Sequence, residues 1–386
     1  MSALDKALGA LATREAALLS LLEALVDVNS YSGHASGVNA TGNLIIEALA
    51  SLPLNLTVEA AETGVRHLSF ATARADVEPS LLLIGHHDTV FPPGEFEGYT
   101  AHDGIAKGPG VLDMKSGLSM IVQVLHALHA AELLERVPLR FVTVGDEEVG
   151  SLTSRPFLES LAKNARAALV FEAGREGDAL ITSRRGSGFA IVQAHGRAAH
   201  AGNALAEGRS AIWALSKFVD RVSMRQVEIA GASANVGLIR GGTSRNTVPD
   251  HATAELDLRF SDRTGQQALT ALLEETARAV EGEIEGTRIE LEVVVSRKPW
   301  ARIDASARLA ARYGAAQVAA GLSYREAPLI GGGSDANTVG ALGIPAIDGL
   351  GARGAGFHTK SEHVELASLL PKSSALLRFI VQEFAL

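Results

Sequence analysis

The chain has 386 residues, of which 47% are hydrophobic and 20% charged, and this composition excludes a disordered or fibrous protein. Its length exceeds the usual size of a single core, so we expect two domains. A net charge of -9, without a dense Lys/Arg block, argues against a nucleic-acid partner. The chain has no cysteine, so any metal ion must be bound by histidine and carboxylates.

The first 30 residues predict one amphipathic helix rather than a secretion signal. Asp5, Glu15 and Glu23 interrupt the apolar positions, and a basic start is missing. No apolar run approaches the length of a membrane span. We therefore expect a cytoplasmic protein without a membrane partner.

In the first half of the chain, apolar strand-like runs alternate with helical runs. The expected strands are 81–85, 139–145 and 167–174, and the expected helices are 116–134 and 154–165. Continuous leucine and β-branched strands between helices predict an α/β domain with a largely parallel sheet covered on both faces. Ligands of such sheets bind at the carboxyl ends of the strands.

From about residue 180 the pattern changes to strands with alternating polar and apolar residues. The expected strands are 189–196, 234–242 and 252–260, and the expected helices are 210–222 and 267–284. This pattern predicts an α+β domain with helices on one face of its sheet. We place this inserted domain at 180–296 and assign 1–179 and 297–386 to the α/β domain.

The first expected strand ends in "HHD". Residues i and i+2 of a strand share a face, so His86 and Asp88 point one way and His87 the other. A metal-ligating imidazole held by a carboxylate has this geometry. A polar turn that faces solvent explains the same three residues equally well. If the metal interpretation is right, His87 tolerates substitution far better than either neighbour.

Further carboxylates stand next to the ends of other predicted elements. Asp113, in "GPGVLDMKSG", precedes the helix expected to begin at Ser116. Asp146, Glu147 and Glu148 crowd the end of an apolar strand, where they repel one another unless water or a metal ion compensates.

Glu172 and His358 complete the set of candidate ligands. Taken singly, each of them is better explained as a structural polar residue at a strand end or in a loop than as a metal ligand. Together with the earlier residues they supply two histidines and several carboxylates, mostly from successive strand ends. Two divalent ions that share one carboxylate would use such a set.

Seven motifs occur in one order along the chain. They are "HHDTV", "GPGVLDMKSG", "GDEEVGS", "FEAGR", "GRAAHAG", "GGGSDANT" and "GFHTKSEHV". In this order they resemble the dizinc metallopeptidase family of bacterial glutamate carboxypeptidase, aminoacylase, acetylornithine deacetylase and succinyl-diaminopimelate desuccinylase. The chain is most similar to the glutamate carboxypeptidase branch. The resemblance implies a zinc-peptidase-like catalytic domain with an inserted, ferredoxin-like domain that serves as lid and dimerisation domain.

The resemblance also implies two zinc ions per subunit, with cobalt or manganese as substitutes. One ion would be bound by His86, Asp113 and Glu172. The other would be bound by Asp113, Glu148 and His358, so that Asp113 bridges the two ions.

Other residues have roles implied only by the resemblance. Asp88 would orient His86, and Glu147 would be the general base. His200, in "GRAAHAG", would reach the site of a partner subunit in a homodimer and stabilise the oxyanion. The peptide bond between Asp113 and Met114 would be cis.

Four residues match positions that the family uses to bind substrate. Asn246 and Arg259 would grip it, and the arginine fork suits a free carboxylate. Gly333 and Ser334, in the "GGGS" loop, would let the backbone approach the substrate.

Three further residues have structural predictions. Ser116 stands where the family usually has glycine, and we expect it to cap the following helix. Trp213 and Trp300 are expected to pack in the interior.

The implied function is a zinc-dependent amidohydrolase or carboxypeptidase that cleaves a small N-acyl or peptidyl amino acid. A hydroxide between the zinc ions, deprotonated by Glu147, would attack the amide carbonyl. Release of glutamate is the leading interpretation. The alternatives are an aminoacylase, a biosynthetic N-deacylase of acetylornithine or succinyl-diaminopimelate, and a binding protein without catalysis.

Overall fold

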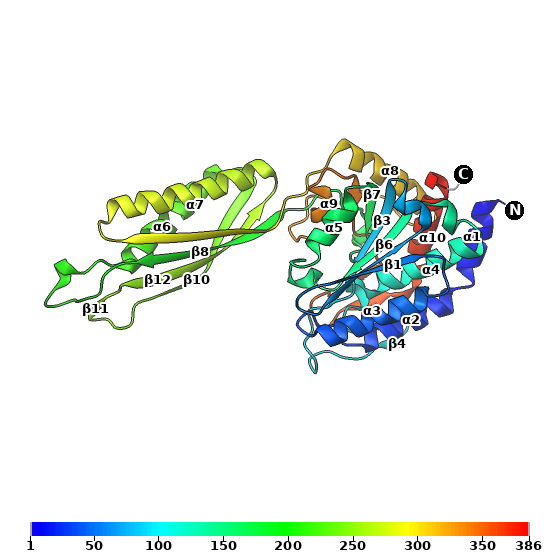
Figure 1. Ribbon diagram of the computed structural model, residues 1–386, viewed down its shortest axis with the longest axis horizontal. Helices are drawn as coiled ribbons and strands as arrows, with labels where there is room; N and C mark the ends of the chain where they lie inside the picture. The colour runs from blue at the N-terminus through cyan, green and yellow to red at the C-terminus, as the bar shows by residue number, and fades with distance from the viewer. Residues whose placement is uncertain (1, 385–386) are drawn as a thin grey trace. The chain divides into compact units, whose positions relative to one another are not determined.

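The computed structural model describes residues 2–384 and divides the chain into two units (Figure 1). The first unit consists of Met1–Thr182, Arg302–Pro328 and Ser334–Leu386. The second unit consists of Ser183–Ala301 and the short segment Leu329–Gly333, which lies outside the expected insertion of 180–296.

A six-stranded sheet forms the centre of the first unit, in the order β1-β2-β6-β3-β7-β14. Its strands are β1 (Asn55–Ala60), β2 (Arg66–Ala71), β3 (Ser80–His86), β6 (Leu139–Val144), β7 (Ala165–Val170) and β14 (Ala346–Ile347). Strands β6, β3, β7 and β14 are parallel to one another. Strand β2 pairs antiparallel with β6, and β1 pairs antiparallel with β2. The prediction of a largely parallel sheet is confirmed.

Helices cover the sheet on both faces. They are α1 (Ala3–Ala12), α2 (Glu15–Asp27), α3 (Ala35–Leu49), α4 (Ser116–Ala130), α5 (Arg155–Ala162), α8 (Asp304–Ala319), α9 (Asp335–Gly340) and α10 (Leu369–Phe384). On β3, Leu81 and Leu83 belong to the core that includes α4, while Leu82 and Ile84 are equally buried. Because alternate residues of a strand point to opposite faces, β3 is buried on both sides, which explains its continuous apolar sequence.

A small antiparallel sheet lies in the same unit, in the order β15-β16-β5-β4. Its strands are β4 (Thr100–His102), β5 (Ile105–Lys107), β15 (Gly354–Ala355) and β16 (His363–Glu365). It brings the segment that follows His358 alongside the segment that leads to Asp113.

The prediction of a single N-terminal helix was wrong. The chain forms α1 and α2, which separate at Thr13 and Arg14. The Thr13 hydroxyl donates to the carbonyl of Ala10 at 2.8 Å, and Arg14 Nε donates to Gln123 at 2.7 Å. These two hydrogen bonds hold the chain at the break between the helices, and apolar periodicity alone does not reveal them.

Helix α4 corrects two further predictions. The stretch Val111–Ala130 is long and apolar enough to span a membrane by composition, but 94% of its most apolar window is buried, so it is a core helix. Ser116 does not cap this helix, because the turn Val111–Lys115 runs directly into it and Ser116 already has helical angles (φ -62°, ψ -41°).

The second unit is an α+β domain with a four-stranded antiparallel sheet in the order β10-β12-β8-β13. Its strands are β8 (Gly186–His195), β10 (Ala232–Gly241), β12 (His251–Phe260) and β13 (Arg288–Arg297), and its helices are α6 (Ala211–Arg225) and α7 (Arg263–Glu283). The chain order βαββαβ is ferredoxin-like, as the resemblance implies. Strand β13 was missed, because most of its residues are only partly buried and it carries several charges.

The two tryptophans differ in burial. Trp300 is fully buried, as expected, but Trp213 is 68% exposed. Helix α6 buries Ala214, Leu215 and Phe218 against the sheet, and Trp213 falls on the opposite side of the helix. The prediction of a packing role was wrong for Trp213.

A buried ion cluster joins the loop after β7 to the last part of the chain. Asp178 is fully buried and accepts a hydrogen bond from Arg353 Nε at 2.8 Å, while Lys372 Nζ lies 3.4 Å from it. Burial raises the pKa of Asp178, but the hydrogen bond from Arg353 and the charge of Lys372 outweigh burial and lower the pKa to about 2. The carboxylate therefore stays ionised at neutral pH.

Replacing Asp178 by Asn should lower the free energy of unfolding by about 3–5 kcal/mol, because the buried Lys372 loses its counter-charge. A folded-state pKa below the unfolded value of 3.8 means that the ion pair stabilises fully above about pH 4 and loses its effect as pH falls toward 2. Urea unfolding should therefore show a difference between wild type and variant that shrinks over this range. Glu176→Gln, in the same loop but exposed, should leave stability nearly unchanged.

Candidate active site

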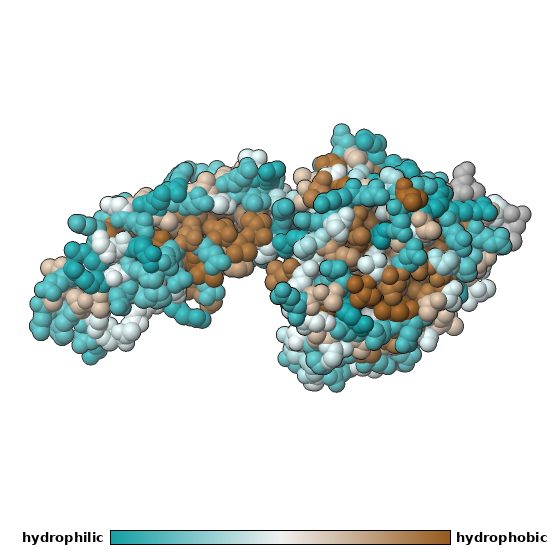
Figure 2. Space-filling view, viewed as in Figure 1, coloured by the Kyte–Doolittle hydropathy of each residue, from teal (hydrophilic) through white to brown (hydrophobic). Residues whose placement is uncertain are grey.

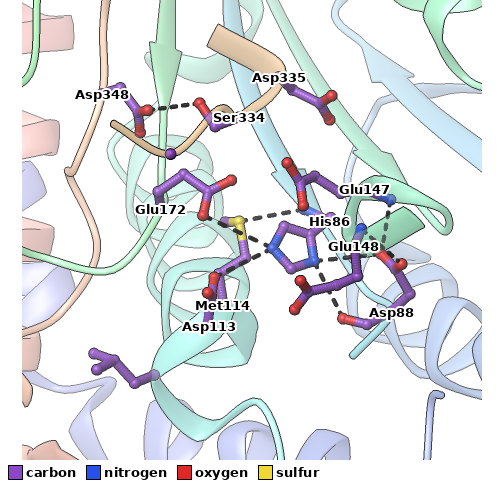
Figure 3. A network of polar contacts seen from close by, with 12 residues as sticks. His86, Asp88, Asp113, Met114, Glu147, Glu148, Glu172, Ser334, Asp335 and Asp348 are labelled. Atoms are coloured by element: carbon purple, nitrogen blue, oxygen red, sulfur yellow. Dashed lines mark hydrogen bonds and ion pairs between the residues drawn. The ribbon is translucent and has the colours of Figure 1, made fainter. Parts of the chain in front are cut away.

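The carboxyl ends of three neighbouring parallel strands meet at one edge of the central sheet. His86 is the last residue of β3, Glu147 and Glu148 follow β6, and Glu172 follows β7. Because β3 lies between β6 and β7, these side chains come together although the sequence separates them (Figure 3).

His86 is held from both ring nitrogens. Its Nδ1 lies 3.3 Å from Asp88 Oδ1, and its Nε2 lies 3.3 Å from Asp113 Oδ1 and 3.9 Å from Glu172 Oε2. The His86 side chain is 1% exposed. The expectation that His86 and Asp88 share a side is met in this geometry.

Asp88 also fixes the turn after β6. Its two carboxylate oxygens accept the backbone N–H groups of Glu147 and Glu148, each at 3.2 Å, and the hydroxyl of Ser32 at 2.7 Å. Burial raises the pKa of Asp88, but the hydrogen bond from His86 outweighs burial, and the pKa is lowered. Ser32 has no motif around it, and the sequence analysis did not find it.

Asp113 lies between two histidines. Its Oδ1 is 3.3 Å from His86 Nε2, and its Oδ2 is 3.4 Å from His358 Nε2. His358 Nε2 also lies 3.1 Å from Glu148 Oε2. The peptide bond from Asp113 to Met114 is cis, as the resemblance implies.

The turn that presents Asp113 needs the glycines that precede it. Gly110 has φ +71°, and a Cβ there would lie 2.4 Å from Thr89. Gly108 also has a positive φ, of +151°. Only glycine takes both the left-handed conformation and the close approach without strain.

The site concentrates negative charge in a buried volume. Burial raises the pKa of Glu148 and of Glu172 to about 7. Hydrogen bonds to Asp113 and Glu148 raise the pKa of His358 to about 10. Burial also raises the pKa of Asp113, but hydrogen bonds from His358 and His86 outweigh burial and lower it. Carboxylates in such surroundings are stabilised by cations.

The donor set fits a metal ion. Ligand atoms of His86, Glu147 and Glu172 lie within 4.8 Å of one another, and so do those of His86, Asp113 and Glu148. Imidazole nitrogen and carboxylate oxygen are zinc ligands, and the cysteine-free chain offers no thiolate. These two groups overlap the ligand sets that the resemblance implies without being identical to them.

Two residues of the same motifs do not belong to the site. His87 Nδ1 lies 3.0 Å from Thr143 Oγ1, and burial lowers the pKa of His87 to about 3, so it stays neutral. Asp146 Oδ2 accepts the backbone N–H groups of Thr153 at 2.7 Å and Ser154 at 3.2 Å, which fixes the approach to α5.

His200 and Asn246 lie close together in the second unit. His200 is in β9 (Ala199–His200) and pairs with Thr247 of β11 (Thr247–Val248). The His200 side chain is exposed, and its Nδ1 accepts the N–H of Gly202 at 3.1 Å. The carbonyl of Asn246 accepts the N–H of Ala201 at 2.9 Å.

The remaining predicted substrate residues belong to other segments of the chain. Arg259, on β12, donates from Nε and Nη2 to the two carboxylate oxygens of Asp257 at 2.8 and 3.0 Å. Gly333 belongs to the second unit and Ser334 to the first. Ser334 is the N-cap of α9, and its hydroxyl donates to Asp348 at 2.8 Å (Figure 3).

A cluster of imidazoles and carboxylates at the strand ends of an α/β unit is typical of metal-dependent hydrolases. The chain matches Peptidase family M20/M25/M40 over residues 82–382, and it belongs to that family. The protein is therefore a hydrolase of a metallopeptidase family, with a candidate metal-binding cluster at the end of its sheet.

Curated relatives cover most of the chain. Carboxypeptidase G2 from Pseudomonas sp. (strain RS-16) is 29% identical over 364 residues, which cover 92% of this chain and 86% of that protein. Succinyl-diaminopimelate desuccinylase from Cereibacter sphaeroides is 27% identical over 348 residues, which cover 83% and 88%.

A solved tripeptidase from Staphylococcus aureus has the same fold, with a TM-score of 0.76 and 24% identity over 95% of this chain and 97% of that one.

The two adjacent histidines should respond differently to substitution. His86→Ala removes a candidate ligand, so we expect zinc content and activity to fall together. His87→Ala should keep zinc and activity but lose stability, because a buried ring that contacts Thr143 is replaced by a cavity. Metal analysis, activity and thermal melting of both variants test this. Equal loss of zinc in the two would contradict the assignment.

Proposed function

We propose that the protein is a zinc-dependent amidohydrolase that releases an amino acid, with glutamate as the leading candidate, from a small N-acyl or peptidyl substrate. The observation that carries the proposal is the position of Asp113, whose two oxygens lie 3.3 and 3.4 Å from the Nε2 atoms of His86 and His358. One carboxylate thus faces two imidazoles, as two cation positions with a shared ligand require. The carboxypeptidase relative supports the release of an amino acid from such a substrate, and the choice of glutamate rests on the sequence resemblance.

We assign two zinc ions to each subunit. His86, Asp113 and Glu172 would bind one ion, and Asp113, Glu148 and His358 the other. When bound, the ions would supply an acidified water and polarise the scissile carbonyl. Cobalt or manganese would serve in their place, because the same nitrogen and oxygen donors suit these metals.

Glu147 is our general base. Its carboxylate comes within 4.8 Å of ligand atoms of His86 and Glu172, and its backbone N–H is fixed by Asp88. It takes the proton of the attacking water and returns it to the leaving amine. In the sets assigned above it binds neither ion, so its carboxylate can serve as the proton acceptor.

The resemblance supplies four candidate substrate-binding residues. The guanidinium of Arg259 is hydrogen-bonded to the carboxylate of Asp257, and a substrate carboxylate would take the place of Asp257. Asn246, Gly333 and Ser334 would contact the substrate, as the resemblance implies. His200 would stabilise the oxyanion.

We further propose a homodimer formed through the second unit, in which His200 serves the partner's site. His200 is exposed, and the second unit also exposes Trp213 (68%), Ile239 (57%) and Leu238 (47%). Figure 2 shows apolar side chains gathered over the strands of this unit. Leu238 and Ile239 lie on β10, an edge strand that is open to pairing. A cytoplasmic location, without nucleic-acid or membrane partners, stays a prediction.

Replacing Glu147 by Gln should lower turnover by about 100-fold or more and leave zinc bound, because the variant loses the proton acceptor but no ligand. Amino-acid release and metal content of the same preparation measure the two effects. Asp113→Ala serves as the contrasting variant, since it should lose metal as well. Near-normal turnover of Glu147→Gln at saturating zinc would contradict the assignment of the base.

A substrate panel separates the proposed function from its alternatives. The panel contains N-acyl and aromatic-acyl glutamates, other N-acyl amino acids, acetylornithine and succinyl-diaminopimelate, each assayed with and without chelator. Chelator-sensitive release of glutamate supports the proposal. Selective hydrolysis of acetylornithine or succinyl-diaminopimelate identifies a biosynthetic N-deacylase. The desuccinylase relative favours this alternative. Broad hydrolysis of N-acyl amino acids identifies an aminoacylase, and no hydrolysis supports a binding protein.

A further inference from the structure

A buried carboxylate that the proposed function does not use holds the turn around Asp113. The Glu362 side chain accepts three backbone N–H groups: Oε1 accepts those of Leu112 at 2.8 Å and Asp113 at 2.9 Å, and Oε2 accepts that of Gly110 at 3.1 Å. Glu362 is 1% exposed. A buried carboxylate with three donors is a strong acceptor, and each of these donors would otherwise be left unsatisfied.

Glu362 also belongs to the loop that carries His358. The N–H of Glu362 donates to the carbonyl of Thr359 at 3.0 Å, and the N–H of Thr359 donates to that of Gly356 at 3.0 Å. His358 lies inside these turns, with φ +62° and a side chain that is 48% exposed. One residue therefore connects the segments that bear Asp113 and His358.

The other ligand segments are fixed by different means. His86 ends β3, and Glu172 lies two residues after the end of β7, next to Phe171, whose N–H donates to the carbonyl of Ile84 at 3.0 Å. The ladder of the central sheet holds these two side chains. Loop Gly356–Glu362 lies between β15 and β16, outside any strand, so the distance between Asp113 and His358 depends on local contacts such as those of Glu362.

We propose that Glu362 is a positioning residue that couples the two cation positions. It keeps Asp113 and His358 at the separation that the second ion, with Glu148, needs, whereas the first ion depends mainly on the sheet. The inference rests on the proposed pair of zinc ions. Loss of the Glu362 carboxylate then weakens the second ion selectively.

The test compares zinc binding by wild type, Glu362→Gln and the matched control Glu365→Gln, whose side chain is exposed on the neighbouring strand β16. The glutamine keeps the size of Glu362 but replaces one acceptor oxygen by an NH₂ group that faces N–H donors. Chelator competition on the zinc-loaded proteins should show two bound ions in wild type and control. In Glu362→Gln one ion should keep its affinity and the other should lose about tenfold or more.

A second measurement does not depend on zinc. Hydrogen exchange of the amides of Leu112 and Asp113 should be faster in Glu362→Gln, while thermal melting shows whether the rest of the unit is intact. Glu362→Asp keeps the charge but is too short to reach all three donors, so it should show the same selective loss of one ion.

The outcomes distinguish the inference from the function on which it rests. Unchanged affinity for both ions in Glu362→Gln, or an equal loss of both, would overturn the coupling role. A wild-type protein that binds fewer than two zinc ions would instead overturn the proposed dizinc function.

Discussion

The carboxylate of Asp113 stands between two imidazoles, with one oxygen 3.3 Å from His86 Nε2 and the other 3.4 Å from His358 Nε2. Glu148 and Glu172 lie beside it in the same buried volume, and burial raises the pKa of both. Like charges at this density destabilise a folded protein unless cations balance them. The arrangement is therefore built around positive charge at two places, and the surrounding contacts serve to keep the ligands there.

Those contacts come at two levels. The ladder of β6, β3 and β7 fixes where the strands end, and thus the positions of His86 and Glu172. Side-chain contacts then fix the loops, because no ladder reaches them. Asp88 holds the turn after β6, and Ser151 donates to Asp335 at 2.5 Å, which connects that turn to the start of α9. A rigid sheet with loops fixed by buried carboxylates can hold ligands precisely.

The sequence revealed what local patterns encode. Apolar runs that end in His or carboxylates marked the strand ends, and alternation separated His86 and Asp88 from His87. His358 lies in a loop without periodicity, so the residues alone made it only a candidate ligand, and the resemblance to a family assigned it to the second ion. The contacts of Glu362 could not be predicted, since its partners are backbone N–H groups about 250 residues away. The break after α1 and the exposure of Trp213 likewise depend on tertiary packing.

The central claim, two zinc ions that share Asp113, is tested most directly by crystals of the zinc-loaded protein. Anomalous difference maps recorded on both sides of the zinc absorption edge locate each ion. The account predicts two peaks about 3.5–4 Å apart, one beside each oxygen of Asp113, near His86 and His358 respectively. A single peak at full zinc occupancy, or two peaks with Asp113 bound to only one of them, would contradict it.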